Sequence, residues 1–185
     1  MMRTDYLEKL TALLRAEKWD AMLLCPSEEL RFFAGFSPLM CERFQGLFLK
    51  QDGRMFYFCN LLTGEEVRAA APDAFPVYTW FDNDIMTEEI CRIFEKEGLA
   101  GGRIAVNSTA QAFNILDIAA ATGTRFENGV PLLEQARICK TPQELDCLRR
   151  AAAIADQGFL HTLPHIRPGM TEGEIHDILV QEMEA

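Results

Sequence analysis

The sequence lacks the features that would place it in a membrane or on a nucleic acid. None of its hydrophobic stretches is long enough to span a bilayer, and the N-terminal segment Met1–Asp20 is interrupted by charges, unlike a signal peptide. Its 18 basic residues form no cluster and are outnumbered by 28 acidic residues, whereas nucleic-acid binding requires a basic surface. We therefore expect neither a nucleic acid nor a membrane as a partner.

Paired cysteine motifs are also missing. The chain has six cysteines, none in a CxxC arrangement, and most of them lie within apolar runs. This pattern is typical of buried, reduced thiols, and it argues against a disulfide framework or a zinc site. Together with the lack of a signal peptide, it predicts a cytoplasmic protein.

What the sequence does contain is an alternation of helical and strand patterns over its first 128 residues. Helices are expected at residues 5–17, 62–71, 84–98 and 108–123, and strands at 21–25, 75–80, 103–106 and 124–128. Between two β-rich runs, Asp52-Gly53 predicts a hairpin, which requires some antiparallel pairing. Asp5, Asp84 and a Ser/Thr at 108–109 are expected to cap helices. The order predicts the α/β class, with a mixed β-sheet flanked by helices.

The last third of the sequence contains two strong helix starts. Thr141-Pro142-Gln143-Glu144 is a capping box with proline at the first helical position, and Thr171 and Glu174 repeat the box spacing. Apolar residues recur every three or four positions from Leu145 to Leu163. Two helices with unmatched apolar faces cannot form a domain alone. We therefore expect this stripe to be more exposed than a finished core allows, or to be covered by a second copy of the chain.

Two blocks of residues resemble the creatinase/Xaa-Pro peptidase family, which includes aminopeptidase P, prolidase and creatinase. One is RxxKTPxELxxLRxAA from Arg137, followed by IRPGMTE from Ile166. The other is ELRFFAGF followed by CERFQGLFL, in which Glu29 stands where family members often have asparagine. The resemblance implies a creatinase-type, ribonuclease H-like N-terminal α/β domain over residues 1–136. Residues 137–185 would then be the linker and first two helices of an incomplete pita-bread catalytic domain.

The same resemblance implies a function. The chain is expected to be the dimerisation and substrate-access portion of a metal-dependent Xaa-Pro aminopeptidase or dipeptidase. In that family two divalent metal ions (Mn, Co or Zn) are held by carboxylates and a histidine placed well beyond the PGxTE motif. The metal ligands are therefore expected outside this chain, which should be inactive alone. A proline-containing peptide is the implied substrate of the full-length protein, and a homodimer the implied assembly.

Arg43 is the one candidate substrate-binding residue. In creatinase-like dimers, the loop at this place reaches the neighbouring subunit's active site, where an arginine can hold a substrate carboxylate. A guanidinium suits this role because its planar fork pairs with a carboxylate through two hydrogen bonds. The alternative is that Arg43 pairs with Glu42 or another surface acid.

The other candidate sites have stronger structural interpretations. His161 and His165 have zinc-ligand spacing, but Pro164 lies between them, and a position near a helix C-terminus explains them without a metal. Asp82 and Asp84 fit a turn and a helix cap better than a cation site. No catalytic and no metal-binding residue is predicted in the chain.

Two alternative functions are kept. The chain could be a stand-alone, non-catalytic dimerisation or ligand-binding module, with its last two helices packed on the α/β unit or exchanged across a dimer. It could also be a fragment of a creatinase-like amidinohydrolase, which shares both domains with the peptidases.

Overall fold

The structure is a computed structural model that describes residues 2–184, and the chain divides into two units at Ile138 and Cys139. The first unit contains strands β1 (Ala21–Leu24), β2 (Gly46–Lys50), β3 (Met55–Asn60), β4 (Val77–Trp80), β5 (Arg103–Val106) and β6 (Arg125–Asn128). Its helices are α1 (Thr4–Ala16), α2 (Glu28–Ala34), α3 (Leu61–Ala70), α4 (Met86–Glu97), α5 (Ala112–Thr122) and α6 (Val130–Arg137).

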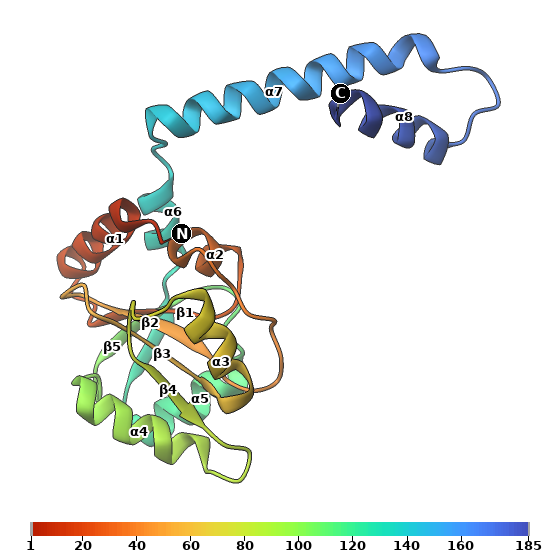
Figure 1. The fold of residues 1–185 in the computed structure, drawn as a ribbon. Helices are drawn as coiled ribbons and strands as arrows, with labels where there is room; N and C mark the ends of the chain where they lie inside the picture. The colour runs from red at the N-terminus through yellow and green to blue at the C-terminus, as the bar shows by residue number, and fades with distance from the viewer. Residues whose placement is uncertain (1, 185) are drawn as a thin grey trace. The chain divides into compact units, whose positions relative to one another are not determined.

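The six strands form one mixed sheet in the order β4-β3-β2-β1-β5-β6 (Figure 1). β2 pairs antiparallel with β1 and β3, while the β1–β5, β3–β4 and β5–β6 pairs are parallel. The predicted hairpin connects β2 and β3, where Gly53 has a φ of 89° and donates its N–H to the Lys50 carbonyl at 2.9 Å. The predicted α/β class with a mixed, helix-flanked sheet is confirmed.

Strands β1, β2 and β3 place apolar residues on both faces of the sheet, and helices cover both faces (Figure 1). Met22 and Leu24 of β1 contribute to the core beneath α1, α2, α3 and α6, whereas Ala21 and Leu23 contribute to the core beneath α4 and α5. β2 and β3 alternate in the same way. This explains why the β1 sequence is a continuous apolar run, without the alternation of a half-exposed strand.

Three of the expected helix caps are wrong. Asp5 lies inside α1, which starts at Thr4, and its charge there complements the positive end of the helix dipole. Asp84 closes a turn by accepting the Phe81 N–H at 2.7 Å, so α4 starts two residues later. The Thr109 hydroxyl accepts a hydrogen bond from Asn107, and α5 begins only at Ala112.

α6 is an element that the sequence patterns did not predict. It starts from Gly129 and carries Pro131 in its first turn, which suits a helix start. Leu132, Leu133 and Ala136 are buried against the core beneath α1. With eight residues the helix is too short to produce a clear periodic signal.

The second unit consists of α7 (Pro142–Thr162), a 3₁₀ turn (Leu163–His165) and α8 (Glu172–Glu184). The predicted capping box at the start of α7 is confirmed, since Thr141 N–H donates to Glu144 Oε2 at 2.7 Å and Glu144 N–H donates to Thr141 Oγ1 at 3.2 Å. The box at Thr171 is also confirmed, with its N–H 2.8 Å from Glu174 Oε2.

The apolar stripe of α7 is exposed, as the sequence predicts. Leu148 is 54% and Phe159 is 56% exposed, and Leu145, Ile154, Leu160 and Leu163 are exposed as well. Among residues 2–184, no helix is both long and apolar enough to cross a membrane.

The prediction of buried thiols holds for only part of the cysteine set. Cys25 and Cys59 are buried in the first unit, and burial raises the pKa of each thiol to about 12. Cys139 and Cys147, in contrast, are exposed in the second unit. No disulfide links the described cysteines.

Candidate functional site

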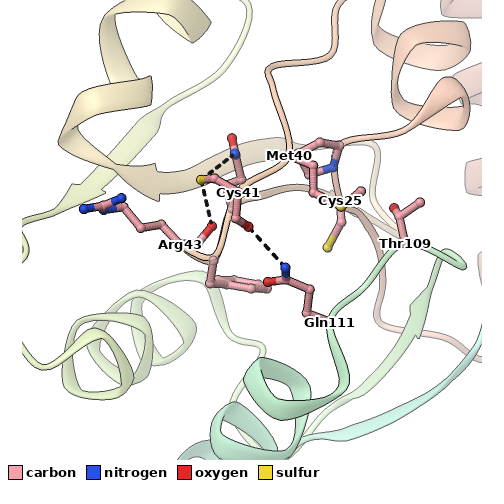
Figure 2. A pocket seen from close by; sticks show the side chains of 9 residues that line it. Cys25, Met40, Cys41, Arg43, Thr109 and Gln111 are labelled. Carbon is pink, nitrogen blue, oxygen red and sulfur yellow. Dashed lines mark hydrogen bonds between the residues drawn. The ribbon is translucent and has the colours of Figure 1, made fainter.

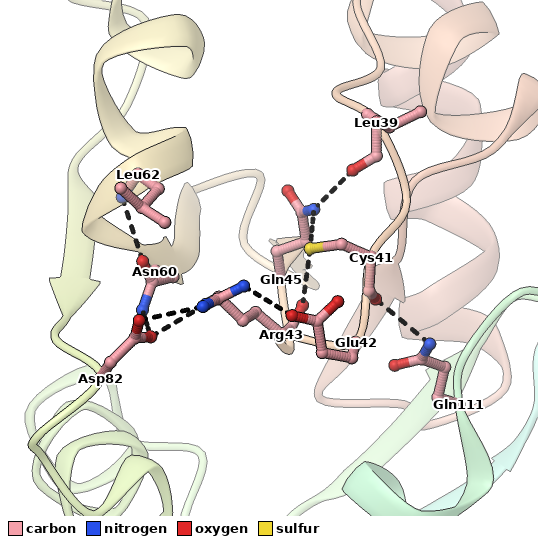
Figure 3. A network of polar contacts seen from close by, with 9 residues as sticks. All are labelled: Leu39, Cys41, Glu42, Arg43, Gln45, Asn60, Leu62, Asp82 and Gln111. Atoms are coloured by element: carbon pink, nitrogen blue, oxygen red, sulfur yellow. Dashed lines mark hydrogen bonds and ion pairs between the residues drawn. The ribbon is translucent and has the colours of Figure 1, made fainter.

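Arg43 lies in the loop between α2 and β2, where β3 and β4 end (Figure 3). Three polar side chains from different segments meet there. Asn60 is the last residue of β3, and Asp82 follows β4 by two residues. Because β3 and β4 are parallel neighbours, their carboxyl ends deliver both side chains to one edge of the sheet.

The Arg43 guanidinium is held by two carboxylates. Its Nε donates to Asp82 Oδ1 at 2.8 Å and its Nη2 donates to Asp82 Oδ2 at 2.9 Å, which is a bidentate pair. On the other side, Nη1 donates to Glu42 Oε1 at 2.5 Å. The structure therefore places Arg43 in an ion pair with Glu42 and with a second surface acid.

Asp82 is itself fixed by Asn60, whose side chain serves two partners. Asn60 Nδ2 donates to Asp82 Oδ1 at 2.9 Å, and Asn60 Oδ1 accepts the Leu62 N–H at 3.1 Å, capping α3. Asn60 is only 2% exposed. The orientation of Arg43 is thus tied through Asp82 to a buried residue of the sheet.

The electrostatics of this cluster follow from the hydrogen bonds. The bonds to Arg43 lower the pKa of Asp82, and the bonds to Asp82 raise the pKa of Arg43. The Arg43 side chain is 32% and that of Asp82 is 58% exposed, so solvent screens their attraction. The pair orients the guanidinium more than it stabilises the fold.

The loop that carries Arg43 is tied to the body of the first unit by two glutamines. Gln45 Nε2 donates to the Leu39 carbonyl at 2.9 Å, while its Oε1 accepts from Tyr57 at 3.2 Å. Gln111 Nε2 donates to the Cys41 carbonyl at 3.2 Å. These bonds fix the backbone on both sides of Arg43 (Figure 3).

A small pocket lies behind the loop and is lined by Cys25, Cys41, Thr109 and Gln111 among others (Figure 2). Its volume of about 10 Å³ is just enough for one water molecule. The Arg43 guanidinium points away from it (Figure 2). Any carboxylate ligand of Arg43 must therefore approach from the outer surface.

His161 and Trp80 have structural roles. His161 Nδ1 lies 3.4 Å from Glu182 Oε2, which links α7 to α8. Trp80 is buried and its Nε1 donates to the Phe44 carbonyl at 3.4 Å. Residues 2–184 bring together no group of three His, Cys, Asp or Glu side chains that could hold a metal ion. These residues do not fit a dinuclear metal centre.

Sequence reasoning missed Asn60 and the role of Asp82. The sequence favours a turn at Asp82, and Asn60 gives no signal beyond being polar at the end of an apolar strand. The pattern that indicates both is a polar residue at the end of a strand or within two residues after it, in two strands that are parallel neighbours.

Comparison with known proteins places these features in context. The family described as the Creatinase/Prolidase N-terminal domain matches residues 7–139. The uncharacterized peptidase SSP1059 of Staphylococcus saprophyticus is 21% identical, over 97% of this chain and 49% of that protein. The chain spans about half the length of the curated relatives it matches.

Two crystal structures of dipeptidases are similar to the chain. The dipeptidase from Pyrococcus horikoshii OT3 is 25% identical with a TM-score of 0.79, over 96% of this chain and 50% of that chain. The dipeptidase PepE from Mycobacterium ulcerans is 24% identical with a TM-score of 0.82, over 96% of this chain and 48% of that chain.

Proposed function

Because the chain belongs to the family of creatinase/prolidase N-terminal domains, we propose that it serves a metal-dependent Xaa-Pro aminopeptidase or dipeptidase as its dimerisation and substrate-access part. Residues 1–136 are the N-terminal domain in this proposal, and residues 137–185 begin the catalytic domain. The observation that carries it is the guanidinium of Arg43, which is oriented at the carboxyl ends of β3 and β4 by Asp82, itself held by the buried Asn60.

The substrate in this proposal is a peptide with proline in its second position, whose free carboxylate is bound by Arg43. Three of the five guanidinium N–H donors are used by described residues, which leaves one N–H on Nη1 and one on Nη2 without a described acceptor. A guanidinium discriminates well between a carboxylate and a neutral amide because it can form two charge-assisted hydrogen bonds at once.

We propose that Arg43 acts across a homodimer, reaching the active site of the partner subunit. Large apolar side chains are exposed in the two loops that carry Arg43 and Asp82: Leu39 is 84%, Met40 is 47% and Phe81 is 49% exposed. Exposed apolar side chains of this size favour burial against another protein surface. A second copy of the chain is the occupant that this proposal requires.

The two divalent metal ions, Mn, Co or Zn, belong in this proposal to the part of the whole protein that lies outside residues 2–184. We also propose a cytoplasmic location, which agrees with the reduced state of the described cysteines.

The test compares the whole protein with this chain. We expect the whole protein to hydrolyse Xaa-Pro dipeptides, to lose activity with EDTA and to regain it with a divalent metal. The 185-residue chain should be inactive under the same conditions. Metal-dependent peptidase activity of this chain alone would contradict the proposal. Hydrolysis of creatine by the whole protein would instead identify an amidinohydrolase.

A further inference from the structure

The two edges of the Arg43 guanidinium are occupied in different ways. One edge, formed by Nε and Nη2, carries both hydrogen bonds to Asp82. Outside this edge, the guanidinium makes a single bond, from Nη1 to Glu42. Either edge of a guanidinium can bind a carboxylate through two parallel hydrogen bonds. Asp82 therefore fills one edge, while the Nη1/Nη2 edge keeps an Nη2 N–H that no described residue uses, beside the Nη1 that bonds Glu42.

The two acids also differ in how firmly they are held. Asp82 is anchored by Asn60, a residue that is 2% exposed and fixed in turn by its bond to the Leu62 N–H. Glu42 is 73% exposed along its side chain and neighbours Arg43 in the sequence. Its carboxylate makes one hydrogen bond to the guanidinium, so solvent can replace it at little cost.

We propose that Asp82 is a positioning residue that presents the Nη1/Nη2 edge of Arg43 to the substrate carboxylate, and that Glu42 occupies this edge until the substrate displaces it. The proposal rests on the function proposed above, because it takes Arg43 as the group that binds the carboxylate. It assigns opposite effects to two acids that touch the same guanidinium.

The opposite effects expected for the loss of Glu42 and the loss of Asp82 distinguish a positioning role of Asp82 from a purely electrostatic effect. Glu42→Gln and Asp82→Asn each remove one negative charge next to Arg43 and change little in side-chain volume. If charge alone mattered, both variants would bind a carboxylate more tightly. If Asp82 orients the guanidinium, its loss releases Arg43 into other rotamers and weakens binding, whereas the loss of Glu42 removes a competitor and strengthens binding.

The kinetic test uses the whole protein with an Xaa-Pro dipeptide and with its C-terminal amide. We expect Glu42→Gln to lower KM for the free acid by about two- to fivefold and Asp82→Asn to raise it by about the same factor. For each variant kcat should stay constant. The ratio of KM for the free-acid dipeptide to KM for its amide should change, because only KM for the free acid changes. Glu65→Gln, an exposed acid paired with Arg68 on α3, is the matched control and should change neither value.

Shifts of KM in the same direction for both variants, or no shift in either, would overturn the proposal. A merely structural role of Asp82 would lower kcat or impair folding without altering the discrimination between acid and amide. If the whole protein hydrolyses neither substrate, the proposed function fails. The positioning is then decided by a second measurement, which needs no activity.

That measurement uses this chain and acetate as the carboxylate probe. The Arg43 side-chain resonances are followed by NMR in the original chain, in Glu42→Gln and in Asp82→Asn. We expect acetate to shift the Nη signals and to leave the Nε–H signal unchanged. In Glu42→Gln the same Nη shift should require a lower acetate concentration than in the original chain. In Asp82→Asn the distinct Nε–H signal should be lost. An acetate-induced shift of Nε–H in the original chain would mean that Asp82 is the displaced group. That result, or no response of Arg43 to acetate, would refute the proposal.

Discussion

Asn107 offers the sharpest test of how the Arg43 side of the sheet is held together. It follows β5 directly and is 2% exposed. Its Oδ1 accepts the Cys25 N–H at 3.0 Å, while its Nδ2 donates to the Cys25 carbonyl at 3.2 Å and to Ser27 Oγ at 2.9 Å. The side chain thus extends the pairing of β1 and β5 by one residue. We predict that Asn107→Ala destabilises the first unit.

The size of the effect follows from which groups lose their partners. The Cys25 carbonyl keeps a hydrogen bond from Ser27 Oγ at 2.9 Å, so removing its bond from Asn107 costs little free energy. The Cys25 N–H loses the Asn107 acceptor, and an unsatisfied buried donor costs roughly 1–3 kcal/mol. We therefore expect the free energy of unfolding to fall by about 2 kcal/mol. At an m-value of about 2 kcal/mol/M, this lowers the urea midpoint by about 1 M.

The assay is urea unfolding followed by tryptophan fluorescence. Both tryptophans, Trp19 and Trp80, lie in the first unit, so the signal reports that unit without a contribution from α7 or α8. Asn83→Ala is the matched control because Asn83 is exposed, and it should change stability by less than about 0.5 kcal/mol. If Asn107→Ala unfolds at the same urea concentration as the control, the side chain does not hold the two strands together and the reasoning is wrong.

Three further predictions follow from the same structure. Cys147 should react rapidly with a thiol reagent in the native chain, whereas Cys25, whose pKa is raised to about 12, should react only after unfolding, as timed absorbance measurements would show. Thr141→Ala should lower the stability of α7 by about 1 kcal/mol and Thr141→Ser should not, measured by amide exchange in the first turn; equal exchange in both variants would exclude a role for the cap. Because its bonds to Arg43 lower the pKa of Asp82 in the folded chain, the pair should be fully present above the ordinary aspartate pKa of about 4 and be lost as the pH falls through the lowered value. An acid titration of the Arg43 Nε–H signal checks this, and loss of the signal above pH ~5 would contradict it.

The elements that the sequence predicts well are those whose causes are local. The Asp52-Gly53 turn and the capping box at Thr141 each depend on a few adjacent residues, and both occur as expected. The helix caps expected at Asp5 and Asp84 are wrong because a carboxylate near a helix start can also serve the first turn or a preceding loop. A sequence pattern alone does not decide between these uses.

The candidate site was predictable only in part, for a related reason. Arg43 stands out because of its loop and the family resemblance, and its role in substrate binding stays a prediction. Its partner Asp82 is 39 positions away in the sequence. The two meet because the start of β2 lies beside the end of its antiparallel neighbour β3, and β3 ends beside its parallel neighbour β4. Asn60 acts on Arg43 through Asp82. Contacts of this kind depend on the sheet order, which local patterns do not contain.

The parallel pairing of β1 with β5 has a consequence for synthesis of the chain. β1 lies in the interior of the sheet, yet its parallel partner begins 82 positions later, with Ala21 opposite Ile104 and Met22 opposite Ala105. At about 5–20 residues per second, a ribosome needs on the order of 4–16 s to make the intervening segment. During this interval the edge of β1 that later pairs with β5 has no partner strand. The nascent chain is therefore most prone to aggregate before β5 emerges, and slower translation between β2 and β5 would prolong that exposure.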